Sequence, residues 1–192
     1  MLANLFESSK LNAENQRKSY RWYQNEIRSL GITQNYGRRL LQSERLVTNV
    51  LPGSMYLFLY DPKYKATLPY YDVLPLVLPF RPMPDGFIGI NLHYLPYMMR
   101  YNLLGELSKL ADKKTTETNR INLSWRLLES SSKYLAATSC VKRYLTSNVK
   151  SKFLRIEYPN WTMAAMLPIE GFQKSNKDRV WRDTRKKITN GI

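Results

Sequence analysis

The chain of 192 residues contains one cysteine, Cys140, and one histidine, His93. A single cysteine excludes a disulfide framework and a cysteine-rich zinc site. A single histidine excludes a histidine-ligated metal cluster and most histidine-based catalysis. Neither GxxxxGK[ST] nor GxGxxG occurs, so the chain lacks both glycine-rich patterns that cradle nucleotide phosphates. We therefore expect no metal and no other cofactor.

Long apolar runs are also missing. No uninterrupted stretch approaches the ~20 apolar residues of a membrane span. The first ten residues include Glu7 and have no signal-peptide core. We expect a soluble protein, either intracellular or assembled into a virion, with no membrane partner.

Acidic residues are scarce relative to basic ones. Lys and Arg total 30 against 15 Asp and Glu, a formal charge of +15, which points to a polyanionic partner. The hydrophobic fraction of 43% is enough to bury a core, so full disorder is excluded. Residues 51–100 are nearly neutral, whereas residues 138–158 and the last twenty are strongly basic. This pattern predicts a helical N-terminal arm over 1–50, an α+β core over 51–172 and a basic C-terminal arm over 173–192.

The centre of the chain does not read as helix. Eight of the ten prolines fall between Pro52 and Pro96, a density that a helix does not accommodate. We expect strands at 55–60, 70–80 and 87–92, forming a small antiparallel unit that is either a sheet or an open, barrel-like arrangement. A further strand at 152–158 is expected to join it. Pro75 and Pro79 predict an edge or irregular strand, and Gly89 predicts a bulge or a close backbone approach.

Helices are expected on both sides of this centre, which makes the fold class α+β. The final helix should be the middle of the basic arm, anchored by Val180, Trp181 and Ile188. The expected helical segments are 11–30, 38–50, 97–110, 121–145, a short one from 159 to Pro168, and the centre of 173–192.

Candidate catalytic groups are few. Asp61 and Asp72, with Lys63, are the nearest approach to a metal-dependent nuclease site, but turn chemistry explains both carboxylates better. His93 ends an apolar strand, which favours a packing role. Cys140 is expected to be a small buried hydrophobe within a helix. We predict that the protein is not an enzyme.

Binding is the function that the charge favours. Three segments, 18–23, 142–144 and 179–182, interleave basic side chains with aromatic ones. The cations are expected to meet DNA phosphates without reading sequence, while the aromatic residues anchor the segments to the core. The predicted DNA-facing residues are Arg179, Arg182, Arg185, Lys186 and Lys187, followed by Lys142 and Arg143.

Residues 60–96 carry a distinctive pattern. It begins as Tyr-Asp-Pro-Lys at 60–63, continues as Leu-Pro-Tyr-Tyr-Asp at 68–72 and closes as Gly-Ile-Asn-Leu-His-Tyr-Leu-Pro at 89–96. This block resembles the DNA end protector family of T4-type tailed phages. No catalytic residues come with the motif.

The resemblance implies a non-enzymatic virion protein of the head–tail region that binds and shields the end of the packaged double-stranded DNA. Its other partners would be portal, neck or tail subunits, and it would be present in several copies in a symmetric assembly. It would reside in the virion, and in the host cytoplasm during assembly. The alternatives are a tail, neck or baseplate component without DNA contact, a nuclease or packaging enzyme, and an RNA-binding protein.

Overall fold

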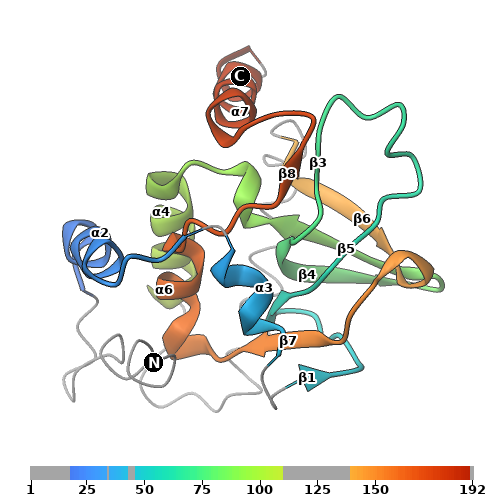
Figure 1. Ribbon diagram of the computed structural model, residues 1–192, viewed down its shortest axis with the longest axis horizontal. Helices are drawn as coiled ribbons and strands as arrows, with labels where there is room; N and C mark the ends of the chain where they lie inside the picture. Colours follow the sequence, from blue (N-terminus) through green and yellow to red (C-terminus); the bar gives the residue numbers. More distant parts are fainter. Residues whose placement is uncertain (1–17, 34, 43–45, 110–138, 191–192) are drawn as a thin grey trace.

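The computed structural model describes residues 18–33, 35–42, 46–109 and 139–190. Two helices precede a run of five consecutive strands, and helices and strands follow in mixed order, so the fold is mixed α+β as expected (Figure 1). The described helices are α2 (Tyr20–Ser29), α3 (Tyr36–Leu40), α4 (Tyr97–Lys109), α6 (Trp161–Met166) and α7 (Lys177–Asn190), with 3-10 turns η1 (Leu92–Tyr94), η3 (Thr146–Asn148) and η4 (Tyr158–Asn160). The described strands are β1 (Leu46–Val47), β2 (Met55–Leu57), β3 (Tyr71–Asp72), β4 (Leu76–Met83), β5 (Gly86–Asn91), β6 (Val141–Leu145), β7 (Phe153–Ile156) and β8 (Phe172–Gln173).

Six strands form one antiparallel sheet in the order β1-β7-β2-β4-β5-β6. The predicted strand at 152–158 is confirmed as β7, which lies between β1 and β2. The sheet does not close, because its edge strands β1 and β6 do not pair with each other. The six strands therefore form an open sheet and no closed barrel. The remaining strands, β3 and β8, pair separately, and this ribbon lies at the same end of the molecule as α7 (Figure 1).

Proline and glycine shape the β4–β5 hairpin. Its register shifts between Pro79 and Arg81, so the expected irregularity is present. The strand is internal, however, and the edge position predicted for it is wrong. Pro79 lies opposite Gly89, where an added Cβ would stand 2.4 Å from Val77 Cγ1. The predicted close approach at Gly89 is confirmed, because no larger side chain fits there without displacing the neighbouring strand.

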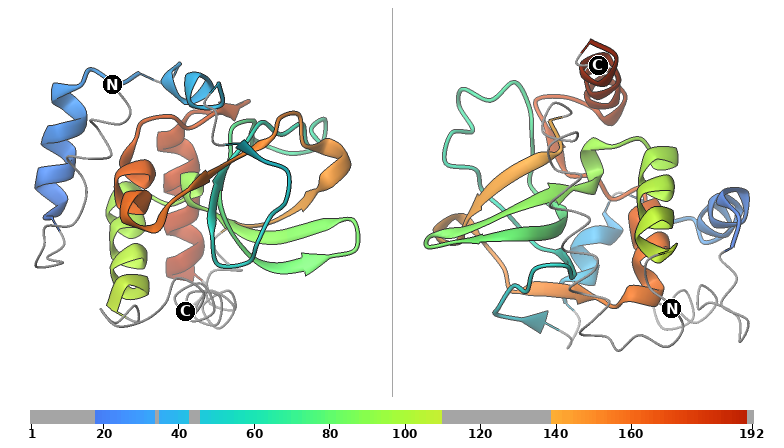
Figure 2. Two further views of the ribbon diagram at one scale, coloured as in Figure 1. Left: turned by 90° about the horizontal axis from the view of Figure 1, so that it is seen from below. Right: turned by 180° about the vertical axis from the view of Figure 1, so that it is seen from behind.

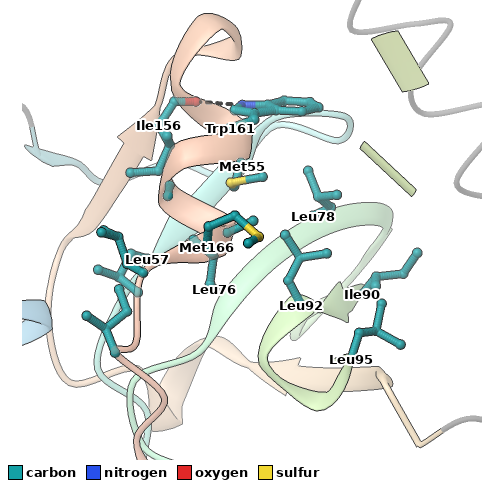
Figure 3. Close-up of a cluster of buried hydrophobic side chains, with 14 of the residues drawn as sticks. Met55, Leu57, Leu76, Leu78, Ile90, Leu92, Leu95, Ile156, Trp161 and Met166 are labelled. Carbon is teal, nitrogen blue, oxygen red and sulfur yellow. Dashed lines mark hydrogen bonds between the residues drawn. The ribbon is translucent and has the colours of Figure 1, made fainter. Parts of the chain in front are cut away.

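The main core lies between one face of the sheet and the helices (Figure 2). Met55 and Leu57 of β2 point to this face and belong to the same buried cluster as Met166 of α6 (Figure 3). Trp161 begins α6 and its Nε1 donates to the Ile156 carbonyl at 2.9 Å, which ties the helix to β7. Removing such side chains from water supplies most of the driving force for folding.

The other face of the sheet is aromatic. Tyr56 alternates with Met55 and Leu57, as the two-residue period of a strand requires, and therefore faces away from the helices. Phe58 contacts Phe153 edge-on, with ring centroids 4.9 Å apart. This second cluster consists of Tyr56, Phe58, Tyr60, Val77, Phe87, Tyr144 and Phe153. It covers the face that no helix packs against in the described part of the chain.

Two helix predictions are wrong in the described residues. The segment 38–50 contains only the end of α3 and then β1, because Leu46 and Val47 pair with β7. Residues 141–145 of the predicted 121–145 helix form β6, which pairs with β5 along its whole length. Long-range strand pairing overrides the local helical pattern in both places. Residues 121–138, and 11–17 of the first predicted helix, lie outside the described residues.

Candidate nucleic-acid interface

Helix α7 is fixed to the core along one side. Asn176 Oδ1 accepts a hydrogen bond from the Arg179 N–H at 3.0 Å and so caps the helix start. Trp181 is buried, and its Nε1 donates to the His93 carbonyl at 2.8 Å. Thr184 Oγ1 donates to the Tyr94 carbonyl at 2.9 Å, one turn further along. Val180 is also buried, so both of these predicted anchors are confirmed, while the Ile188 side chain lies outside the described residues.

The opposite side of α7 is a basic face, which we define as Arg179, Arg182, Arg185 and Lys186. All four side chains are exposed. They are three and four residues apart, which places them on one side of a helix. No carboxylate among the described residues forms an ion pair with Arg179, Arg182 or Lys186. The helix therefore directs these cations to solvent, while the contacts on its opposite side hold it against the core.

Lys187 belongs to a different part of the surface. Its Nζ donates to Ser139 Oγ, just before β6. Lys142 of β6 lies near it and holds its Nζ 4.4 Å from the centroid of the Tyr94 ring. Burial, and then the Lys187 charge, lower the pKa of Lys142. These two predicted residues therefore lie near each other, where α7 passes β6.

Arg143 is separated from both groups by the alternation of the strand. Its Nη2 donates to both carboxylate oxygens of Asp85, at 2.9 and 2.7 Å. The hydrogen bond and charge of Arg143 lower the pKa of Asp85, and Asp85 raises that of Arg143. About half of each side chain is exposed, so the pair contributes little to stability and its guanidinium can exchange partners. The structure thus divides the seven predicted residues into three groups. Four form the basic face of α7, Lys142 and Lys187 lie near each other beside β6, and Arg143 pairs with Asp85.

The aromatic residues next to these cations mostly serve packing, as expected. Tyr23, Tyr144 and Trp181 are each at most 8% exposed. Two basic residues outside the predicted DNA-facing set have specific roles. Lys174 donates to three backbone carbonyls of the loop after β2, at 2.6, 2.8 and 3.2 Å. Lys63 lies on that same loop beside the exposed ring of Tyr64.

The acidic residues have structural partners. The Asp72 carboxylate accepts hydrogen bonds from the Leu74 and Gly171 N–H groups and lies 2.8 Å from His93 Nδ1. Both side chains of this pair are essentially closed to solvent. His93 is fully buried, in keeping with the expected packing role, and its Nε2 has no hydrogen-bond partner among the described residues. Asp61 pairs with Lys65 at 2.7 Å, and within the described ranges no cluster of three potential metal ligands occurs.

Cys140 is completely buried, which confirms its packing role, although it precedes β6 rather than lying in a helix. None of the helices in the described part of the chain is long and apolar enough to span a membrane.

Comparison with known protein families identifies the chain. Residues 7–185 match the model of the family described as phage T4 terminal DNA protecting protein. No curated protein and no solved structure matches the chain. The match extends far beyond the 60–96 block and includes most of the basic face of α7. Because it spans most of the chain, the protein belongs to the phage T4 terminal DNA protecting protein family, whose members are non-enzymatic phage proteins that protect the terminal DNA end.

Proposed function

We propose that this chain protects a double-stranded DNA end sterically, with the basic face of α7 as the main phosphate-binding surface. The observation that carries the proposal is this face of exposed cations, held rigidly on a member of a DNA end protecting family. Each Lys or Arg that meets a phosphate releases counterions, which favours binding to DNA of any sequence. A covered end gives an exonuclease nothing to engage, and no bond has to be broken.

The anchoring of α7 supports this assignment. Trp181 and Thr184 bond to consecutive carbonyls of η1, so the helix cannot rotate its cations away without losing both bonds. Pre-organised cations bind phosphate at a smaller entropic cost than cations on a free tail. Lys142 and Lys187 extend the positive charge toward β6, and Arg143 adds to it when it leaves Asp85.

The test uses Arg179→Glu/Arg182→Glu and the matched control Lys150→Glu/Lys152→Glu, which reverses two exposed charges on the β6–β7 connection. The first variant should bind a linear duplex at least about tenfold more weakly, with a salt dependence reduced by about two units in log–log slope. It should also lose protection of the duplex against an exonuclease. Both variants should unfold with a free energy within about 0.5 kcal/mol of the wild type.

Two outcomes would contradict the proposal. Equal loss in both double variants would mean that total charge matters and that α7 has no special role. A wild-type protein that binds no DNA at moderate salt would favour the rival function, a structural component whose basic surface contacts acidic neighbours.

We further propose that the protein acts in the head–tail region of the virion, against portal, neck or tail subunits and in several copies. The family supports a phage setting, and a protein that protects the terminal DNA end has to lie where that end is held. A reconstruction of the particle tests this placement: density for the chain away from the DNA channel would contradict it.

A further inference from the structure

A groove of about 370 Å³ lies between the loop after β2 and strand β6. This volume is within the range of roughly 300–1,000 Å³ that small-molecule sites occupy. Six of the fifteen lining residues are tyrosines, and the charged lining residues are three cations and two carboxylates. The groove is lined chiefly by Lys63, Tyr64, Tyr71, Tyr94, Lys142 and Arg143.

The aromatic rings of the groove differ in accessibility. Tyr94 and Tyr144 are only 3% exposed and form its floor. Tyr64 stands at the rim with 64% of its surface exposed, beside Lys63 Nζ at 5.5 Å. Tyr71 is half-buried between these levels. An exposed aromatic ring above a tyrosine-lined hollow is suited to stack on a flat, polar ring such as a nucleobase.

The groove also contains a cation, Lys142, that has no counter-ion within the described part of the chain. Lys142 is half-buried, and among the described residues no carboxylate forms an ion pair with it. Its charged neighbour is Lys187. The two carboxylates that line the groove are engaged elsewhere, Asp72 by His93 and Asp85 by Arg143. Two neighbouring ammonium groups that pair with no carboxylate of the described residues favour an anion beside them.

The walls of the groove are fixed. The Lys174 ammonium donates to the carbonyls of Lys65, Ala66 and Leu68, which gives the loop a defined path without regular secondary structure. At the start of the loop, Asn148 Nδ2 donates to the Asp61 carbonyl at 2.7 Å, and the Asp61 N–H donates back to the Asn148 carbonyl at 3.0 Å. A ligand therefore meets a preformed hollow.

From these observations we infer that the groove receives one unpaired terminal nucleotide of a DNA strand. The base stacks on Tyr64, with Tyr71 beside it, and a phosphate contacts Lys142. A duplex is too wide to enter, and an internal nucleotide remains paired, so only a frayed end supplies the ligand. Because every base has a stacking face, recognition is independent of sequence. The inference rests on the proposed end-protecting function and explains how the protein distinguishes an end from the interior of a duplex.

The first experiment measures affinity for a linear duplex and for a covalently closed circle of the same sequence. The wild type should prefer the linear form. Tyr64→Ala should lower affinity for the linear duplex by about tenfold and leave affinity for the circle unchanged. Tyr64→Phe, which keeps the ring, should behave as the wild type. Tyr64 is exposed, so neither change should disturb folding.

A second measurement uses photocrosslinking. A duplex with 5-iododeoxyuridine as its terminal nucleotide should crosslink to Tyr64 or Tyr71, while the same base at an internal position should not. If the wild type prefers ends but Tyr64→Ala keeps that preference and no crosslink forms, the groove assignment is overturned and end protection stands. If the wild type binds neither DNA form, the proposed function itself fails.

Discussion

Arg100 and Arg182 carry the same guanidinium group in opposite surroundings. Arg100 is fully buried, donates to the carbonyls of Leu95, Ala165 and His93, and pairs with Glu170 at 2.7 Å. Arg182 projects from α7 and forms no ion pair with a described carboxylate. Arg100 connects α4 with α6 and η1, whereas the charge of Arg182 is available to a binding partner.

The two arginines are nevertheless connected. The Arg100 guanidinium lies 5.4 Å from the centroid of the Trp181 ring, the same ring that anchors α7. Trp181 in turn bonds to the His93 carbonyl, which Arg100 also contacts. The buried cation therefore supports the element that displays the exposed ones. The comparison teaches that the total charge of +15 does not describe one property, since some cations build the fold and others serve binding.

The largest expected effect comes from removing the buried cation. Arg100→Met should lower the free energy of unfolding by about 3–5 kcal/mol, because Glu170 is left buried without its counter-ion and three carbonyls lose a donor. Urea denaturation of the variant and the wild type at neutral pH measures this difference.

The matched control is the double variant Arg100→Met/Glu170→Met. Replacing both partners removes the uncompensated charge, so the double variant should be more stable than Arg100→Met alone. If the two are equally unstable, the ion pair is not the origin of the loss and the comparison with Arg182 fails.

Acid should produce the next largest effect. Burial raises the pKa of Glu170, but the Arg100 charge and hydrogen bonds outweigh it and hold the pKa below its usual value. The pKa of Asp72 is likewise lowered, since His93 and the hydrogen bonds outweigh burial. A carboxylate with a lowered pKa stabilises the fold above its unfolded pKa, and this stability is lost as the pH falls through the folded value. The free energy of unfolding should therefore begin to fall below about pH 4 and should keep falling as the pH drops through the folded pKa of each carboxylate.

Glu170→Gln separates the two carboxylates. This variant should be less stable than the wild type at pH 7, because an uncharged amide replaces the partner of Arg100. Its stability should decline less steeply with acid, since only Asp72 still titrates in the buried network. Equal slopes for the variant and the wild type below pH 5 would contradict the role given to Glu170.

Local patterns were enough to predict several elements. The proline-rich centre, the strand at 153–156 and helix α4 all follow from spacing and composition. Strand β6 was missed because Val141 and Leu145, four residues apart, also fit a helix. Its identity depends on pairing with β5, more than fifty residues earlier, which no local pattern records.

The sequence indicated which residues supply positive charge, but it did not indicate how these residues are arranged in space. The sequence grouped Lys142 with Arg143, but a strand sends neighbouring side chains in different directions, so one reaches Tyr94 and the other reaches Asp85. The partnership of Arg100 with Glu170 spans 70 residues and leaves no trace in a linear scan. The sequence does not distinguish Lys174 from the other cations near the C-terminus. Its three acceptors are backbone carbonyls, which every residue has, so no residue type in the sequence reveals the interaction.

Lys174 adds a third case to the comparison. It is exposed like Arg182, but like Arg100 it donates hydrogen bonds that hold the fold together. Its backbone adopts φ of +62°, a conformation that costs a non-glycine residue about 1–2 kcal/mol. Lys174→Met keeps this cost and loses the three hydrogen bonds, so the free energy of unfolding should fall by about 1 kcal/mol. Lys150→Met, on the exposed β6–β7 connection, should change it by less than about 0.5 kcal/mol.

Lys174→Gly separates the effect of the lost hydrogen bonds from the cost of the positive backbone φ angle. Glycine loses the same bonds but adopts positive φ without strain, so this variant should be more stable than Lys174→Met. Both changes should speed amide hydrogen exchange in residues 62–69, because the ammonium no longer holds the loop. If exchange there is unchanged while stability falls, Lys174 acts only through its own backbone, and the fixed wall of the tyrosine groove needs another origin.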